Sequence, residues 1–212
     1  MSTIGFVLYP GFTALDVIGP YEVLSRMPGH RAIFVAETAD AVLEERGTIA
    51  ITPDATFENA SSLDVVLVPG GPGQFEQMGN EALRRYLRRV AESADLVCSV
   101  CTGALLLGDA GLLEGKRVTT HWLALDALGS FGATPVTERV VRDGNLITAA
   151  GVSAGIDLAL MLATELVGKE VAQAIQLGIE YDPQPPLDAG SPAKAPAAIV
   201  DAMRSLARPF FR

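Results

Sequence analysis

The chain has 212 residues, a net charge of −9 and a hydrophobic fraction of 49%. This is enough apolar material for one large core and excludes a disordered or fibrous chain. The acidic balance disfavours nucleic acid as a partner, because no surplus of Lys and Arg exists to neutralise phosphates. Two cysteines, Cys98 and Cys101, and two histidines, His30 and His121, are too few for a zinc finger or a disulfide scaffold. The length predicts one domain over residues 1–212.

We expect no targeting signal at the N-terminus. The apolar run at residues 4–9 lacks a basic start, and Pro10-Gly11 ends it too early for a signal peptide. No apolar run approaches the roughly 20 residues of a transmembrane helix. We therefore expect a cytoplasmic protein that does not contact a membrane.

Short apolar runs alternate with helical patterns along the chain. Runs bounded by turn residues predict strands, at residues 4–9, 32–36, 64–68, 95–100, 116–120, 136–141 and 146–150, with a small hairpin or irregular strands at 41–51. Apolar residues spaced along one face predict helices, at residues 13–27, 80–93, 102–112, 153–167 and 169–178. This alternation predicts an α/β protein with a mostly parallel sheet covered on both faces.

Local signals refine these elements. Pro20 lies inside the first helix and predicts a break or kink there. The turn at 143–145 predicts that the last two strands form a hairpin, and Ser153 is the expected cap of the following helix. Residues 183–212 are rich in proline at their start, so we expect an extended C-terminal arm that ends in a short helix near 196–206. This arm would pack on the surface or lie at a subunit interface or pocket rim.

Three loops follow predicted strand ends, at residues 10–16, 69–73 and 101–103. Ligands in such sheets bind at the carboxyl ends of the strands, so we expect these loops to converge on one site. The Gly-rich loop at 69–73 permits close approach of its backbone to a ligand. It lacks the Lys and Ser/Thr of a P-loop, so nucleotide binding has no support.

The two cysteines have different surroundings. Cys98 lies within a predicted strand, and three residues at about 3.3 Å each separate its Cα from that of Cys101 by more than the ~7 Å that a disulfide allows. We therefore predict no disulfide and a buried core role for Cys98. Cys101 stands between strand and helix, the setting of a nucleophile elbow, or of a structural cysteine at a turn. The helix N-terminus is expected to lower the thiol pKa, and the amides from Thr102 onward to hold developing negative charge.

Asp16 is the second ionisable group of interest. A carboxylate among apolar neighbours must find a partner or shift its pKa upward, unless it simply caps the first turn of a helix. A Cys–His dyad would need a histidine near the Cys101 sulfur. His121 either approaches that sulfur or plays a structural part, and His30 is interpreted as a surface residue.

Taken together, these motifs resemble the DJ-1/PfpI superfamily over roughly residues 3–196. The resemblance rests on Val68-Pro69-Gly70-Gly71, Val100-Cys101-Thr102-Gly103-Ala104, Ala110-Gly111-Leu112-Leu113, Thr119-Thr120-His121-Trp122 and Ala154-Gly155-Ile156-Asp157. Residues 15–20, 139–146 and 180–192 are most similar to the isocyanide-hydrating subgroup. The resemblance implies a flavodoxin-like three-layer sandwich and a homodimer. It also implies an enzyme without cofactor or metal that converts an isocyanide to an N-substituted formamide through a covalent thioimidate.

The resemblance also implies roles for individual residues. Cys101 would be the nucleophile and Asp16 its acid/base partner. Thr102 and the backbone of Gly70 and Gly71 would bind the substrate and stabilise the charged intermediate. Proteases of the superfamily carry His after the nucleophile, so Thr102 argues against proteolysis. The segment 149–151 is poorer in glycine than the subgroup's pattern, which leaves the shape of the substrate pocket open.

Two other functions stay open at this stage. Similar domains form the ligand-sensing half of AraC-like transcription regulators, which also need a helix-turn-helix domain. We expect no such domain in this short, acidic chain. A glyoxalase-like or stress-protective member of the superfamily is the other alternative.

Overall fold

The computed structural model describes residues 2–60 and 62–207. Within these residues the central sheet has seven strands. Their order is β10 (Val140–Asp143), β11 (Leu146–Ala149), β7 (Leu96–Val100), β6 (Val65–Val68), β1 (Ser2–Val7), β2 (His30–Ala36) and β5 (Ala55–Thr56). All neighbours pair in parallel except β10 and β11, which form the expected hairpin. The mostly parallel sheet predicted from the sequence is confirmed.

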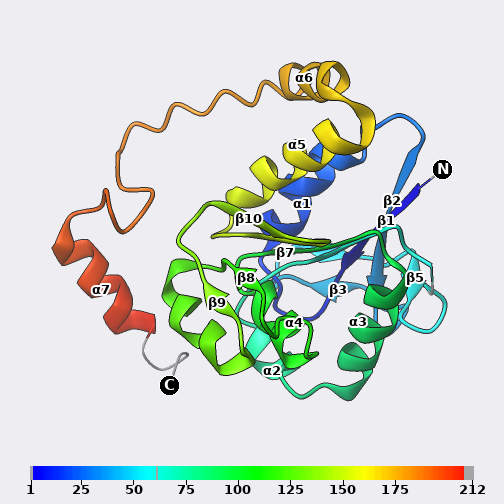
Figure 1. The fold of residues 1–212 in the computed structure, drawn as a ribbon, viewed down its shortest axis with the longest axis horizontal. Helices are drawn as coiled ribbons and strands as arrows, with labels where there is room; N and C mark the ends of the chain where they lie inside the picture. Colours follow the sequence, from blue (N-terminus) through cyan, green and yellow to red (C-terminus); the bar gives the residue numbers. More distant parts are fainter. Residues whose placement is uncertain (1, 61, 208–212) are drawn as a thin grey trace.

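Helices cover both faces of the sheet (Figure 1), which confirms the three-layer architecture. One face carries α1 (Ala14–Leu24), α5 (Ala154–Val167) and α6 (Lys169–Gly178). The other carries α2 (Gln74–Gln77), α3 (Glu81–Ser93), α4 (Gly103–Asp109) and the 3-10 helix η1 (Trp122–Phe131). None of the helices in the described residues is long and apolar enough to cross a membrane.

The central strands are mostly apolar because both faces of the sheet are covered. Every residue of β6 and β7 is buried. Cys98 lies in the middle of β7, in register with Leu67 of β6 on one side and Ile147 of β11 on the other. It is fully buried and unpaired, and burial raises the pKa of its thiol to about 12. The prediction that it is a core residue is confirmed.

The predicted break at Pro20 is wrong, because α1 continues through this residue. Pro20 is buried against α5, where an added Cβ on Gly155 would lie 2.9 Å from Pro20 Cγ. Packing between the two helices therefore keeps α1 continuous across a residue that has no backbone N–H to donate.

The segments at 116–120 and 136–141 also differ from expectation. In the first segment only Arg117–Val118 (β8) is a strand, and it pairs with Thr134–Pro135 (β9) as a small parallel ladder outside the main sheet. In the second segment only Val140 and Val141 are in a strand, as the start of β10. The intervening η1 helix was not predicted, and neither were the short elements α2 and β5. A second small pair, β3 (Val42–Leu43) with β4 (Ala50–Ile51), is the antiparallel hairpin expected at 41–51.

Ser153 stands at the expected N-terminus of α5 but does not cap it. Its backbone is already helical, and no side-chain hydrogen bond caps the first turn. Instead, the Ser153 hydroxyl accepts a hydrogen bond from the Arg139 guanidinium at 3.3 Å. The predicted helix is present, whereas the predicted capping role is wrong because a side chain from outside the helix occupies the hydroxyl oxygen.

The C-terminal segment leaves the sheet region after α6. Residues 181–196 form neither helix nor strand, and they lead to α7 (Ala197–Ala207), which lies at the edge of the molecule in Figure 1. The guanidinium of Arg204 in α7 lies 5.9 Å from the ring centre of Trp122 in η1. Residues 208–212 of the predicted arm lie outside the described part of the chain.

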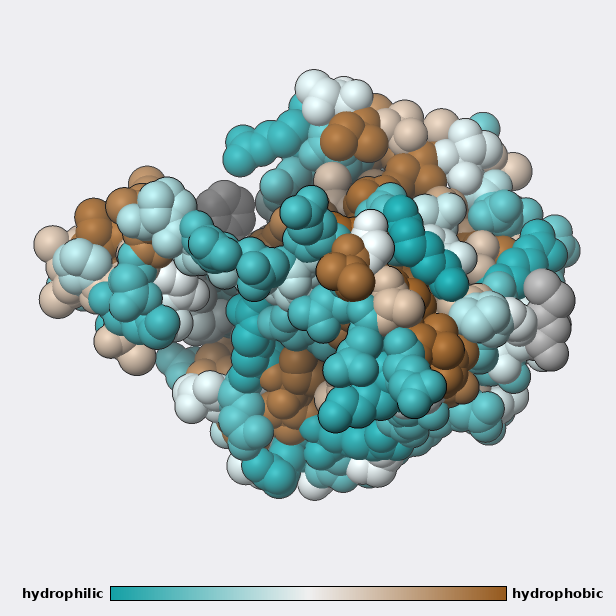
Figure 2. All heavy atoms as spheres, turned by 90° about the horizontal axis from the view of Figure 1, so that it is seen from above, coloured by the Kyte–Doolittle hydropathy of each residue, from teal (hydrophilic) through white to brown (hydrophobic). Residues whose placement is uncertain are grey.

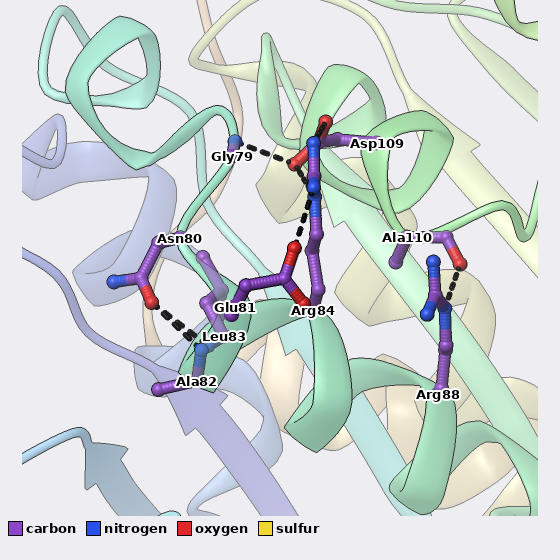
Figure 3. A network of polar contacts seen from close by, with 9 residues as sticks. All are labelled: Gly79, Asn80, Glu81, Ala82, Leu83, Arg84, Arg88, Asp109 and Ala110. Carbon is purple, nitrogen blue, oxygen red and sulfur yellow. Dashed lines mark hydrogen bonds and ion pairs between the residues drawn. The ribbon is translucent and has the colours of Figure 1, made fainter.

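A polar cluster joins α3 to the end of α4 (Figure 3). Arg84 Nε donates to Asp109 Oδ2 at 2.7 Å, and the backbone N–H of Gly79 donates to the same oxygen at 2.9 Å. Arg88 donates to the carbonyl of Ala110 at 2.8 Å. The hydrogen bonds from the Arg84 guanidinium hold the pKa of the Asp109 carboxyl below its usual value. These contacts fix the far end of α4, the helix that begins beside Cys101.

We expect Arg84→Ala to lower the melting temperature at pH 7 by about 2–4 °C, as typical for the loss of one good polar contact in a chain of this size. The substitution leaves Asp109, whose side chain is only 9% exposed, without its cation. Scanning calorimetry provides the measurement. Arg85→Ala, at an exposed arginine of the same helix, is the matched control. An equal fall in melting temperature in both variants would show that the contact of Arg84 with Asp109 does not stabilise the fold.

Candidate active site

The three loops meet at the carboxyl ends of β1, β6 and β7, as predicted. The N–H of Thr13 donates to the Gly70 carbonyl at 2.9 Å, and the N–H of Gly73 donates to the Gly11 carbonyl at 3.0 Å. The N–H of Gly71 donates to Thr102 Oγ1 at 3.0 Å. Each loop is therefore hydrogen-bonded to the next one.

Cys101 forms the predicted elbow between β7 and α4. Its φ of 55° lies in the left-handed region, which costs a non-glycine residue about 1–2 kcal/mol. Its N–H donates to the carbonyls of Ala149 at 3.1 Å and Ala150 at 2.8 Å, and its carbonyl accepts from Thr120 Oγ1 at 2.7 Å. These contacts hold the strained residue in place from both sides.

Gly70 lets the glycine-rich loop approach the elbow closely. A Cβ at this position would lie 2.6 Å from Thr102 Oγ1 and 2.9 Å from the Cys101 Cβ. Such distances are too short for real Cβ contacts, so any side chain at position 70 would push the loop away from the elbow. The glycine is required by this contact with neighbouring atoms.

The Cys101 thiol is almost enclosed, with the residue only 6% exposed. Burial raises its pKa above the ordinary value, and the nearby Asp16 charge raises the pKa further. The backbone N–H groups of Thr102 and Val152 and the Thr102 hydroxyl act in the opposite direction. The predicted lowering of this pKa by the helix is wrong, because the seven-residue α4 cannot offset the loss of water and an adjacent carboxylate.

Asp16 lies in the first turn of α1, yet its carboxyl reaches across to the glycine-rich loop. It is fully buried, and its Oδ2 accepts from the N–H of Gly70 at 2.8 Å. Burial raises its pKa to about 7, while the Gly70 amide and the Cys101 thiol, as hydrogen-bond partners, lower it. Glu45 nearby raises it. The upward pKa shift and the partner expected from the sequence are both present.

The free oxygen of Asp16 is suited to proton transfer with Cys101. Among the described residues, Asp16 Oδ1 is buried with no hydrogen-bond partner of normal geometry. A carboxyl whose pKa is near 7 accepts or releases a proton readily at neutral pH. The raised thiol pKa favours a neutral thiol beside a carboxyl that can take up its proton, and not a preformed thiolate.

Thr102 and the glycine amides are organised around this pair. Thr102 stands at the start of α4 without capping it, because its Oγ1 accepts from the N–H of Gly71. The hydroxyl proton of Thr102 is then directed elsewhere, toward the thiol. The N–H groups of Gly70 and Gly71 are thus engaged by Asp16 and Thr102 in this structure.

His121 takes no direct part in the pair. Its Nδ1 accepts from the N–H of Leu123 at 3.4 Å, and burial lowers its pKa. Among the described residues, no hydrogen bond joins His121 to Cys101, so the structure gives no Cys–His dyad. His30 begins β2 and is half-buried, so it is only partly at the surface.

Three residues around Cys101 and Asp16 were not recognised from the sequence as parts of the site. Tyr9 is buried and donates to the Pro69 carbonyl at 2.8 Å, and burial followed by the charges of Asp16 and Cys101 raises its pKa. Val152 acts through its backbone N–H, which no side-chain pattern reveals. Thr120 was noted only as part of a motif, and its contact with the Cys101 carbonyl is visible only in three dimensions.

A metal centre finds no support in residues 2–60 and 62–207. No group of three or more His, Cys, Asp or Glu side chains there is arranged to hold an ion. The chemistry offered by the site is that of one thiol, one carboxyl, one hydroxyl and several backbone amides.

Comparison with known proteins places this geometry in a family. The sequence model of the DJ-1/PfpI family matches residues 2–165. The chain belongs to the DJ-1/PfpI family. This confirms the resemblance found in the sequence.

Individual relatives extend over nearly the whole chain. An isonitrile hydratase of Pseudomonas putida is 50% identical over 206 residues, which cover 97% of this chain and 90% of that protein. A solved ThiJ/PfpI family protein from Pseudomonas syringae is 40% identical, with a TM-score of 0.96 over 99% of this chain and 87% of its own. An HTH-type transcriptional regulator, CdhR of Pseudomonas aeruginosa, is 32% identical over 176 residues, which cover 79% of this chain but 51% of the regulator.

The raised pKa of Asp16 in this DJ-1/PfpI site predicts a pH-dependent cost to stability. Because its pKa is higher in the folded protein than in the unfolded chain, ionisation opposes folding increasingly from about pH 4 up to pH 7. The free energy of unfolding of Asp16→Asn minus that of the native chain should therefore be about 2–4 kcal/mol larger at pH 8 than at pH 4.

Urea unfolding of both proteins across this pH range provides the measurement. Asp126→Asn, at an exposed carboxylate of η1, controls for loss of charge alone. A difference between Asp16→Asn and the native chain that stays constant with pH would contradict the assignment.

Proposed function

We propose that this protein hydrates an isocyanide to the corresponding N-substituted formamide. The observation that carries the proposal is the buried pair of Cys101, on its elbow, and Asp16, with a free oxygen and a pKa near 7. The 50% identity to an isonitrile hydratase supports the choice of substrate class.

In the first half of the proposed reaction, sulfur adds to the terminal carbon of the isocyanide. Asp16 accepts the thiol proton as the carbon–sulfur bond forms. The proton then passes from Asp16 to the same carbon, which yields a covalent thioimidate in which nitrogen is doubly bonded to that carbon. No charge is left on the substrate after these two transfers.

Water completes the reaction. Its oxygen bonds to the thioimidate carbon, and one of its protons reaches the nitrogen through Asp16. The carbon–sulfur bond then breaks with its electron pair going to sulfur, and the hydroxyl proton returns to sulfur as the formamide leaves. Isocyanide and water supply every atom of the product, so no oxidant or reductant is required.

The neighbouring groups have supporting parts in this proposal. The Thr102 hydroxyl and the N–H groups of Thr102 and Val152 lie against the sulfur and stabilise negative charge on it when the carbon–sulfur bond breaks. The amide of Gly70 orients the Asp16 carboxyl, and that of Gly71 orients the Thr102 hydroxyl. Gly70 and Gly71 therefore stabilise the intermediate through the groups that they hold.

We also propose that two copies of the chain associate. Large apolar side chains are exposed on α1 and on the β3–β4 hairpin, at Leu15, Leu43 and Ile49. Burying such residues in an interface removes apolar surface from water. The net charge of −9 supports small molecules, and not nucleic acid, as ligands.

The two cysteines provide the decisive test of the nucleophile. We expect Cys101→Ala to abolish conversion of cyclohexyl isocyanide to N-cyclohexylformamide, whereas Cys98→Ala retains turnover because Cys98 only fills the core. Asp16→Asn should lower kcat by about 10²–10⁴-fold, the usual contribution of a positioned acid/base group. Product formation followed by chromatography gives the rates.

Turnover by Cys101→Ala would overturn the covalent mechanism. Methylglyoxal is the matched alternative substrate in the same assay. Consumption of methylglyoxal by the native protein without any isocyanide turnover would replace the proposal by a glyoxalase-like function.

The pKa of Asp16 also predicts the pH dependence of the rate. Asp16 must be ionised to accept the thiol proton, so kcat/KM should fall about tenfold per pH unit below pH 7. Above pH 7 the rate should be level until another group ionises. A pH–rate profile of the native protein measures this dependence. If the residual rate of Asp16→Asn showed the same inflection near pH 7, the inflection would belong to a group other than Asp16.

A further inference from the structure

Tyr9 is a buried titratable residue to which the proposed reaction assigns no part. Hydrophilic residues cover most of the face of the molecule shown in Figure 2, whereas Tyr9, two residues after the end of β1, is only 2% exposed. A buried phenol usually needs a hydrogen-bond partner, and the Tyr9 hydroxyl donates to the carbonyl of Pro69 at 2.8 Å. A side chain from the end of β1 is therefore tied to the glycine-rich loop after β6.

The carbonyl that Tyr9 contacts belongs to the same peptide group as the Gly70 N–H. This peptide is trans, so its C=O and its N–H point in opposite directions within one plane. The carbonyl accepts from the Tyr9 hydroxyl at 2.8 Å on one side, and the N–H donates to Asp16 Oδ2 at 2.8 Å on the other. Phenol, peptide and carboxyl thus form one chain of hydrogen bonds.

The two hydrogen bonds of this chain strengthen each other. A donor at the carbonyl oxygen polarises the peptide and makes its N–H a better donor, by roughly 10–30% per bond. Pro69 and Gly70 are buried, and Asp16 is fully buried, which places both bonds in surroundings of low dielectric, where such bonds are electrostatically stronger than in water. The Tyr9 hydroxyl therefore strengthens the backbone amide that donates to Asp16.

The titratable groups around the chain leave Tyr9 protonated and make the Gly70 amide important. Burial raises the pKa of the Tyr9 phenol well above its ordinary value, and the charges of Asp16, Cys101 and Glu45 raise it further, so the phenol remains a donor at neutral pH. Burial also raises the Asp16 pKa. The Gly70 amide opposes this rise most strongly, followed by Cys101 from the elbow, whereas Glu45 from the β3–β4 hairpin adds to it.

We propose that Tyr9 is a positioning residue for Asp16, which acts through the Pro69–Gly70 peptide by holding its N–H on the carboxylate that accepts the thiol proton. The part of Tyr9 in turnover rests on the hydratase function, whereas its hold on Asp16 does not. Tyr9 is not itself a catalytic residue, because its hydroxyl is engaged by the Pro69 carbonyl and not by the reacting atoms.

Tyr9→Phe removes the hydroxyl and keeps the ring. We expect the inflection of the kcat/KM profile, near pH 7 in the native protein, to move upward by about 0.5–1 pH unit, because a weaker Gly70 donor stabilises the carboxylate less. At pH 6 kcat/KM should fall about 3–10-fold, whereas at pH 9, where Asp16 is ionised in both proteins, it should stay within about twofold of the native value.

Tyr86→Phe is the matched control. It makes the same change at another buried tyrosine, in α3, whose hydroxyl has no hydrogen-bond partner among the described residues. Its pH profile should coincide with that of the native protein.

Urea unfolding gives a readout that does not depend on turnover. The pKa of Asp16 is higher in the folded protein than in the unfolded chain, so stability is lost as pH rises from about 4 through the folded pKa. A further rise of that pKa in Tyr9→Phe extends the loss to higher pH. The fall in urea midpoint caused by Tyr9→Phe should therefore be larger at pH 8.5 than at pH 5, and equal at both pH values in the Asp16→Asn background.

Three results would overturn the proposal. They are an inflection that stays near pH 7 in Tyr9→Phe, an equal shift in Tyr86→Phe, and a loss of about a hundredfold or more in kcat/KM at pH 9, which would make the phenol a direct participant. If Tyr9→Phe does not fold, ortho-fluorotyrosine in place of Tyr9, a stronger donor, should move the inflection downward, and any other result would contradict the proposal. Failure of the native protein to convert isocyanides would overturn the hydratase function alone, and the urea series would still test Tyr9.

Discussion

The hydrogen bond from the Gly70 amide to the buried Asp16 carboxyl connects the parts of the site. A fully buried carboxylate is costly unless its oxygens find donors, and the backbone N–H of Gly70 supplies one at 2.8 Å. That bond requires the loop after β6 to lie directly against the elbow, which excludes a Cβ at position 70. The positions of three segments therefore depend on each other: α1, the glycine-rich loop and the start of α4.

The elbow adds a second constraint of the same kind. Cys101 adopts a left-handed backbone conformation that is unfavourable by itself. Hydrogen bonds from β11, through the carbonyls of Ala149 and Ala150, and from Thr120 compensate for that cost. The contact with Thr120 also places the neighbouring His121 against Gly151. The strained Cys101 backbone is thus held by contacts from two segments far from it in the sequence.

Local pattern was a reliable guide where burial alone decides the structure. The apolar strands, the convergence of the loops, and the positions of Cys98 in a strand and of Cys101 at the elbow followed from the sequence. Prediction failed where a distant contact decides: α5 keeps α1 continuous through Pro20, and Arg139 occupies the Ser153 hydroxyl. The predicted lowering of the Cys101 pKa was wrong for the same reason, since burial of the thiol and its proximity to Asp16 both arise from tertiary structure. The role of Val152 was hidden because it is a backbone amide.

The raised thiol pKa has a consequence for the kind of substrate that suits this site. A preformed thiolate favours an electrophile that needs only a nucleophile. The terminal carbon of an isocyanide must gain both a sulfur atom and a proton to become a thioimidate. A neutral thiol beside a carboxyl whose pKa is about 7 holds both within one hydrogen-bonded pair, and the proton has only to cross from sulfur to carbon by way of Asp16. Enclosure, which raises both pKa values, also limits competing proton transfer from solvent. Burial of the pair is therefore compatible with the proposed reaction, because the same dehydration that suppresses the free thiolate keeps the proton where that reaction needs it.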